Sequence, residues 1–197
     1  MIDTERDVRI LEAMADQMHP YLIEQELLWP IAGPGTSDMP RLTIGGFLFR
    51  RHRLLALHDA LTPAQQERLD ATLVKWQTTR KEWSLHYDQK LIREWDMRVN
   101  LLAGFLDDCE EEGRTSCSSQ WPIQAEHRTI LYHVQDEATD RAVDGLDKST
   151  LSRVDRGLRR YLLSGEGDNF LWDDDLAVAY PRSVYWWLWV RPYEHDD

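Results

Sequence analysis

The fold is decided by one long segment, which runs from Pro63 to Ala103 and reads PAQQERLDATLVKWQTTRKEWSLHYDQKLIREWDMRVNLLA. After its first residue the segment contains neither proline nor glycine, the two residues that most often end a helix. Thr62 stands directly before it, and threonine followed by proline at the first helical position marks a helix start. The segment therefore predicts one helix of about 40 residues and about 60 Å, with Thr78 and Thr79 as its weakest point.

Apolar side chains of this segment and its continuation fall on two stripes. One stripe consists of Leu69, Leu73, Trp76, Trp83, Tyr87 and Leu91, and the other of Leu85, Ile92, Trp95, Val99, Leu102 and Leu106. A helix that is apolar on two sides is normally covered on both of them. We therefore expect an all-α protein, an irregular helical bundle around one long central helix.

The residues before this helix predict a kinked first helix, a loop and a second helix. Residues 1–29 carry a helical apolar stripe that Pro20 interrupts, which predicts a kink. Residues 30–43 are rich in proline and glycine and predict a loop. A second helix from Ile44 to Ala60 would form a hairpin with the long central helix, so that residues 44–112 make one unit.

The residues after this helix predict a shorter helical pair and an aromatic end. Residues 113–121 predict a polar loop, and residues 122–164 predict two helices. Residues 165–197 form an aromatic-rich segment that we expect to wrap over the bundle. The whole chain, residues 1–197, then makes a single helical domain, in keeping with its length.

Composition and charge exclude several classes of protein. The chain carries 23 Lys and Arg against 35 Asp and Glu, a net charge of −12, and 42% of its residues are hydrophobic. That hydrophobic share excludes a disordered acidic tail, and the negative charge argues against a nucleic-acid partner. No apolar run approaches the roughly 20 residues of a membrane helix, and the first residues lack the features of a secretory signal. We expect a cytoplasmic protein without membrane association.

Cysteine usage also favours a cytoplasmic protein. Cys109 and Cys117 are the only cysteines. Two thiols at this spacing could be bridged, but neither a Cys-x-x-Cys motif nor a disulfide-dense composition is present. We therefore expect both thiols to be reduced.

Candidate contacts for another protein lie in two segments. Tryptophan often dominates binding energy, and an acidic surface steers a basic partner. The candidate residues are Trp186, Trp187 and Trp189 together with Asp107, Asp108, Glu110 and Glu111. The alternative is that the tryptophan rings complete the core, because most large aromatic side chains are buried.

Two basic islands and one set of possible metal ligands provide the alternatives. The islands are Arg50, Arg51 and Arg53, and Arg153, Arg156 and Arg160. Guanidinium groups suit phosphate or carboxylate, so islands that lie together could hold an anionic ligand or a nucleic acid; otherwise they pair with acidic runs or face solvent. Glu82, His86, Glu126 and His133 could form a zinc or iron site, although Glu-x-x-His and HExxH motifs are absent.

The sequence favours a non-catalytic, cytosolic helical protein that acts through protein–protein interaction as a subunit, adaptor or inhibitor. No catalytic motif is present, so we expect no cofactor and no enzymatic activity. The expected partner is another protein, with a basic surface as one option and a second copy of the chain as another. A metal-dependent bundle enzyme and an anionic-ligand or nucleic-acid binder remain the alternatives.

Overall fold

The computed structural model describes residues 3–33, 35–36, 38–112, 114–160, 162–163 and 170–192. Its helices are α1 (Thr4–Ile23), α2 (Ile44–Ala56), the 3-10 helix η1 (His58–Ala60), α3 (Pro63–Glu82), α4 (Ser84–Glu112), α5 (Arg114–Asp140), α6 (Lys148–Leu158) and the 3-10 helices η2 (Asp174–Ala179) and η3 (Trp186–Leu188). Two-residue strands, β1 (Leu162–Leu163) and β2 (Arg191–Pro192), pair antiparallel.

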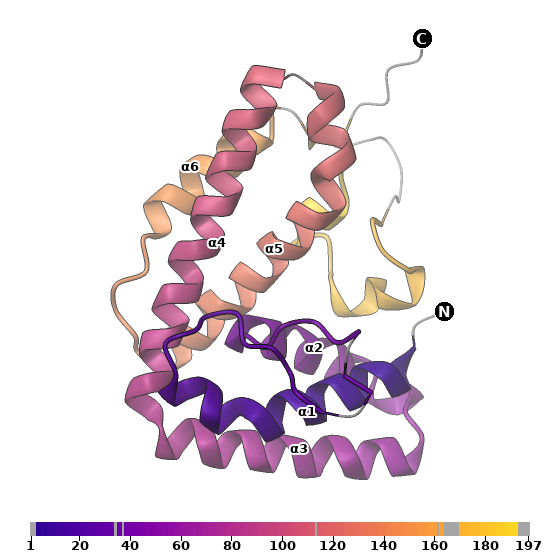
Figure 1. Cartoon of the computed structure of the whole chain (residues 1–197). Helices are drawn as coiled ribbons and strands as arrows, with labels where there is room; N and C mark the ends of the chain where they lie inside the picture. Colours follow the sequence, from indigo (N-terminus) through magenta and orange to yellow (C-terminus); the bar gives the residue numbers. More distant parts are fainter. Residues whose placement is uncertain are drawn as a thin grey trace.

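The helices form an irregular bundle around α4, which confirms the expected fold class. Figure 1 shows α4 and α5 as a long hairpin, with α1, α2 and α3 lying across its lower end and α6 beside α4. α4 contacts each of the other five α-helices. Buried residues from all of them belong to one hydrophobic core.

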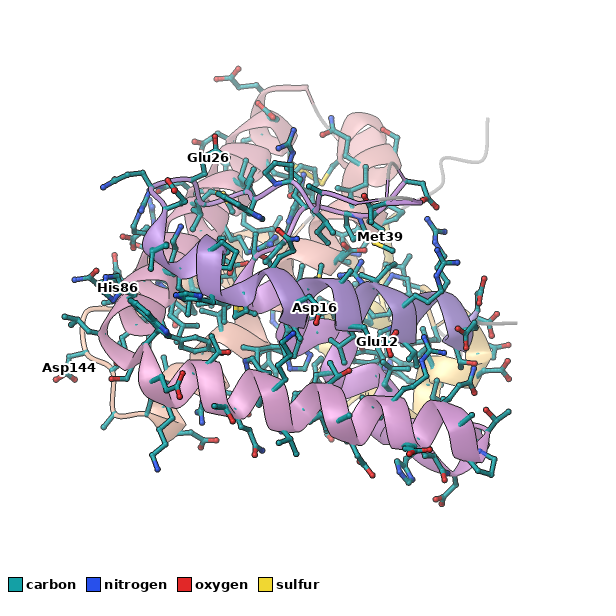
Figure 2. The ribbon with its side chains drawn as sticks, turned by 60° about the horizontal axis from the view of Figure 1, so that its bottom comes forward. Glu12, Asp16, Glu26, Met39, His86 and Asp144 are labelled. Carbon is teal, nitrogen blue, oxygen red and sulfur yellow. A yellow bond between two sulfur atoms is a disulfide. The ribbon has the colours of Figure 1, made fainter. Side chains whose placement is uncertain are left out.

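α1 and α3 lie side by side and are joined by ion pairs. In Figure 2, the labelled Glu12 and Asp16 of α1 lie next to α3. The guanidinium of Arg68 donates to both carboxylate oxygens of Glu12, at 2.8 and 2.5 Å, and the amine of Lys75 donates to Asp16 at 2.6 Å. The start of α3 at the Thr62 cap is confirmed.

The expected single helix over residues 63–103 is wrong, because the chain turns at Trp83 and divides it into α3 and α4. Trp83 has φ −109° and ψ 35°, although backbone hydrogen bonds continue across it. Its ring packs against the rings of His19 and His86, with centroids 4.6 and 5.5 Å away. The corner directs α3 along α1 and α4 along α5, so the apolar residues serve two helices rather than two sides of one rod.

The first two helices are shorter than expected. α1 continues through Pro20 but ends at Ile23, so residues 24–29 are not helical. The loop that follows is confirmed, and backbone hydrogen bonds between Trp29 and Leu42 close it. α2 ends at Ala56, and η1 takes the place of its expected last turn.

The expected polar loop at residues 113–121 is wrong, because α5 begins at Arg114. A disulfide joins Cys109 of α4 to Cys117 of α5, so the expectation of reduced thiols is also wrong. Trp121 is fully buried and stacks on Phe105, with ring centroids 6.2 Å apart. Cys117 and Trp121 are four residues apart and lie on one buried face, which holds this polar stretch in a helix. α6 ends at Leu158, earlier than the expected end at residue 164.

An aromatic C-terminal segment packs over the bundle, as expected for the part of residues 165–197 that is described, residues 170–192. η2 contacts α2, and η3 contacts α5. The rings of Tyr180 and Tyr185 lie against His52 of α2, with centroids 5.1 and 5.9 Å away. Residues 165–169 and 193–197 of the expected wrap lie outside the described residues.

A buried carboxylate fixes the position of α2. Glu94 of α4 is fully buried, and its Oε2 accepts a hydrogen bond from the backbone N–H of Gly45 at 2.7 Å. Its other oxygen accepts from Nε of Arg98 at 2.8 Å. A carboxylate at a helix N-terminus also interacts favourably with the helix dipole. Glu94 therefore holds the start of α2 against α4.

Candidate functional site

A polar cleft of about 180 Å³ opens between α2, α3 and α5. It is lined by Leu48, Arg51 and His52 of α2, by Trp76, Gln77 and Arg80 of α3, and by His133, Asp136, Glu137 and Asp140 of α5. The α3 and α5 residues recur at steps of one, three and four, which places them on one face of each helix. We call this hollow the α2–α3–α5 cleft.

Trp76 contacts two guanidinium groups of the cleft. Cζ of Arg51 lies 5.1 Å from its ring centroid, and Cζ of Arg80 lies 5.3 Å away. Arg80 forms an ion pair with the buried carboxylate of Glu137. Arg51 forms no ion pair with any described residue, and its Nε is buried without a hydrogen-bond partner among them. Arg51 is therefore the cation of the cleft that remains available to a ligand.

Two imidazoles, those of His52 and His133, lie together with ring centroids 4.6 Å apart. Nε2 of His52 lies 2.7 Å from the carbonyl oxygen of Ala179. Because that oxygen can only accept, Nε2 carries the proton, and Nδ1 of the neutral ring is an acceptor. His133 is 7% exposed, and its Nε2 has no hydrogen-bond partner among the described residues. A buried polar atom without a partner costs about 1–3 kcal/mol, so the ring of His133, which lines the cleft, has an unmet hydrogen-bonding capacity beside the cavity.

Both imidazoles are neutral at pH 7. Burial lowers the pKa of His133 to about 3, and the neighbouring His52 and Arg51 act in the same direction. Burial also lowers the pKa of His52, against the hydrogen bond to Ala179, which raises it. Bases with a pKa far below the operating pH are poor proton acceptors. The pair therefore favours hydrogen bonding to a ligand over acid–base catalysis.

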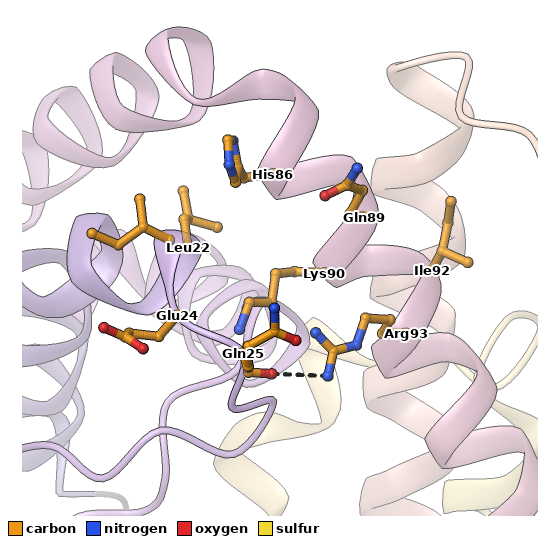
Figure 3. Close-up of a pocket in the computed structure, with 9 residues that line it drawn as sticks. Leu22, Glu24, Gln25, His86, Gln89, Lys90, Ile92 and Arg93 are labelled. Carbon is orange, nitrogen blue, oxygen red and sulfur yellow. Dashed lines mark hydrogen bonds between the residues drawn. The ribbon is translucent and has the colours of Figure 1, made fainter.

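A larger hollow, of about 480 Å³, lies where residues at the end of α1 face the first turns of α4 (Figure 3). Its two cations already have partners. Arg93 donates to the backbone oxygen of Gln25 at 2.8 Å, and Lys90 donates to the backbone oxygen of Glu26. The amine of Lys90 also lies 4.2 Å from the ring centroid of Tyr21. Burial lowers the pKa of Lys90 to about 8. These cations hold the chain that follows α1, so we assign this hollow a structural role.

The structure does not bring the four expected metal ligands together. His86 lines the hollow of Figure 3, His133 lines the α2–α3–α5 cleft, and Glu126 lines a third hollow with Arg53. Glu82 is exposed at the end of α3. Within the described ranges, no group of three or more His, Cys, Asp or Glu side chains is arranged to hold a metal ion. The metal-enzyme alternative thereby loses its proposed site.

The two basic islands lie on separate elements. Arg50, Arg51 and Arg53 belong to α2, near the lower end of α4 in Figure 1, whereas Arg153, Arg156 and Arg160 lie on and just after α6, beside its upper part. Arg53 pairs with Asp7 at 3.4 Å. The second island lines a groove of about 310 Å³ together with Asp107 and Glu110 of α4, so it faces an acidic run of the same chain without forming an ion pair with it in the described part of the chain.

The acidic run lies at the far end of the α4–α5 hairpin. Asp107, Asp108, Glu110 and Glu111 are all exposed, and none forms an ion pair with a described residue. Asp108 and Glu111 lie outside the lining of the arginine groove. Asp108 and Glu111 are therefore the carboxylates of the run that share no hollow with the second island.

The C-terminal tryptophans are mainly structural. Trp187 is 1% exposed, and its Nε1 donates to Oγ1 of Thr129 at 2.8 Å, so it offers no surface to a partner. Nε1 of Trp189 donates to the backbone oxygen of Tyr180 at 2.8 Å. Trp186 is half-buried, with Cζ of Arg159 3.6 Å from its ring centroid. Of the three expected contacts, Trp186 and Trp189 keep partly exposed rings.

Sequence reasoning missed most of the α2–α3–α5 cleft. Arg51 and His133 were singled out, but for two different sites, and Arg80, Gln77 and Asp136 were not singled out at all. The available signal was the step of three residues between Gln77 and Arg80 and between His133 and Asp136. That signal could not be interpreted without the corner at Trp83, which sets the direction of α3.

Comparisons with known proteins assign the chain to no family. No protein-family model, no curated protein and no solved structure matches the chain. None of the helices in the described ranges combines the length and the apolar character that crossing a membrane requires. The geometry of the molecule itself therefore carries the functional argument.

Proposed function

We propose that this protein is a non-catalytic binding protein whose α2–α3–α5 cleft holds a small charged molecule. The observation that carries the proposal is a polar cavity lined by His133, a side chain whose buried Nε2 has no hydrogen-bond partner among the described residues. The unpaired guanidinium of Arg51 in the same cavity supports it. The low pKa of His133 supports binding rather than proton transfer.

A blocking substitution and a matched neighbour test this proposal. Gln77 and Thr78 are both exposed, but only Gln77 lines the cleft. Glycine, acetate, methylammonium and inorganic phosphate are titrated calorimetrically into the wild type, Gln77→Phe and Thr78→Phe. We expect heat of binding from at least one probe in the wild type and Thr78→Phe, and its loss in Gln77→Phe. Binding of none of the probes, or equal binding by both variants, contradicts the proposal.

The second candidate is the interaction with a basic protein that the sequence favours. What supports it is the pair Asp108 and Glu111, exposed and without an ion pair in the described residues, close to a disulfide that restrains the hairpin end. A rigid, charged end gains from preorganisation and electrostatic steering. The probe is an oligolysine peptide. We expect Asp108→Asn with Glu111→Gln to weaken its binding more than Glu67→Gln with Asp70→Asn, which removes the same charge from the exposed side of α3. Equal weakening by both double variants would mean that only the net charge of the protein matters, and it would contradict a binding site at Asp108 and Glu111.

A cytoplasmic location remains a prediction from composition. The Cys109–Cys117 disulfide weighs against it, because the cytosol keeps most thiols reduced. Alkylation of free thiols in intact cells, followed by mass measurement, distinguishes a cytoplasmic location from an oxidising compartment. Alkylation of both cysteines favours the cytoplasm, and protection of both favours an oxidising compartment.

A further inference from the structure

We propose that the ligand of the α2–α3–α5 cleft is a small zwitterion of amino-acid size, with a carboxylate near Arg51 and an ammonium group near Asp136 and Asp140. This inference rests on the proposed function and names the chemical class of its ligand. It follows from the distribution of charge around the cleft and from the volume of the cleft.

The carboxylate end is defined by Arg51. Its guanidinium lies against Trp76 and lacks an anionic partner in the described part of the chain. Stacking on an aromatic ring holds a guanidinium in one plane, and a planar guanidinium can bind a carboxylate through two parallel hydrogen bonds. Arg80, also within 5.3 Å of the Trp76 ring centroid, is already neutralised by Glu137 and contributes less.

The ammonium end is defined by Asp136 and Asp140, which lie one turn apart on α5. Both line the cleft and are exposed, so they stand at its rim. Neither forms an ion pair with a described residue, in contrast to the buried Glu137. Two carboxylates four residues apart repel each other, and a bound ammonium group relieves that repulsion.

The other lining groups disfavour ligands of a single charge. A simple anion near Arg51 would meet the three carboxylates of α5, and a simple cation near α5 would meet Arg51 and Arg80. The imidazoles of His52 and His133 add hydrogen bonds without charge, because both are neutral at pH 7. A volume of about 180 Å³ is below the range of drug-sized pockets. These conditions fit a short molecule with both charges.

Calorimetric titration of the full chain with glycine, L-alanine, acetate and methylammonium at one ionic strength tests the inference. We expect glycine or L-alanine to bind about tenfold or more tightly than acetate and methylammonium, a difference of about 1.4 kcal/mol. If acetate or methylammonium binds as tightly as the amino acids, the inference of a zwitterionic ligand is wrong, while the proposed function stands. If inorganic phosphate alone binds, the zwitterion inference is wrong while the proposed function stands, and if neither phosphate nor any of these probes binds, the proposed function is wrong as well.

Two double variants locate the ammonium site. Asp136→Asn with Asp140→Asn should bring the affinities for glycine and acetate together, with acetate binding retained. Glu67→Gln with Asp70→Asn removes the same charge from an exposed face of α3 that does not line the cleft and should leave the tenfold preference unchanged. An unchanged preference in the α5 variant, or its loss in the α3 variant, contradicts the inference.

Discussion

Gly45 shows how a single residue permits the close approach of α2 and α5. A Cβ atom at this position would lie 2.5 Å from Cγ2 of Ile130, 2.7 Å from Oε1 of Glu94 and 2.8 Å from Cγ2 of Val134. All three neighbours belong to well-packed side chains of the core, so none can move freely. The absence of a side chain at Gly45 therefore sets the distance between two walls of the α2–α3–α5 cleft.

We expect Gly45→Ala to lower the free energy of unfolding by about 1–3 kcal/mol, because overpacking forces neighbouring side chains to shift. Gly104→Ala is the matched control. A Cβ atom at Gly104 meets nothing within 4 Å, and alanine in a helix is favoured over glycine by up to about 1 kcal/mol. Urea denaturation measures both variants. A Gly45→Ala protein as stable as the wild type would show that α2 and α5 are not in close contact.

His133 makes stability depend on pH. Its pKa is about 3 in the folded protein, against an ordinary value of 6.5. As pH falls below 6.5, the unfolded chain takes up a proton that the folded chain refuses, so stability falls. Between pH 7 and pH 5 this amounts to about 2 kcal/mol at about 1.4 kcal/mol per pKa unit.

The measurement is urea denaturation of the wild type and of His133→Gln at pH 7 and at pH 5. We expect the wild type to lose about 2 kcal/mol more than the variant over this interval. Because the comparison is between two pH values of the same variant, the direct cost of the substitution cancels. An equal loss in both proteins would mean that His133 is not buried as a neutral ring.

At the scale of elements, the disulfide holds the end of the α4–α5 hairpin. Cys109 and Cys117 are eight residues apart, and closing so short a loop stabilises a protein by about 2–3 kcal/mol. We expect the variant Cys109→Ala with Cys117→Ala to lose about that much and to expose Trp121. Denaturation followed by tryptophan fluorescence measures both. Wild-type protein treated with a reductant is the control and should behave as the variant does.

The sequence allowed helices with strong local signals to be predicted and missed features that depend on tertiary contacts. The start of α3 was predictable because Thr62, Pro63 and Gln65 form a local capping arrangement. The corner at Trp83 was not, because the residue is neither proline nor glycine and its position depends on packing against His19, far away in sequence. The cleft was missed for the same reason, since three helices meet there only after that corner.

At the scale of the whole molecule, the C-terminal segment is joined to the bundle through a few buried polar contacts. Nε1 of Trp187 donates to Thr129, and Cζ of Arg128 lies 4.0 Å from the Trp187 ring centroid. Arg128 in turn forms an ion pair with Asp155 of α6, at 2.8 Å. Trp187 thus connects residues 170–192 to α5, and through Arg128 to α6.

We expect Trp187→Phe to destabilise the protein by about 1–3 kcal/mol, because it removes a buried hydrogen-bond donor. Trp186→Phe is the matched control, since Trp186 is half-buried and makes no indole hydrogen bond to a described residue. We expect Trp186→Phe to lower the free energy of unfolding by less than about 1 kcal/mol. Thermal denaturation compares the two. Equal losses would contradict the structural role assigned to Trp187.

The hydrogen bond between His52 and Ala179 joins residues 127 positions apart. During synthesis on the ribosome, α2 emerges long before the carbonyl group that orients its imidazole. A nascent chain can therefore begin to assemble its first helices early, yet it acquires the finished arrangement of His52 only after Ala179 has been synthesised. A prematurely terminated product that lacks Ala179 would retain the arginine and carboxylate side chains of the cleft while leaving this ring free to choose either tautomer.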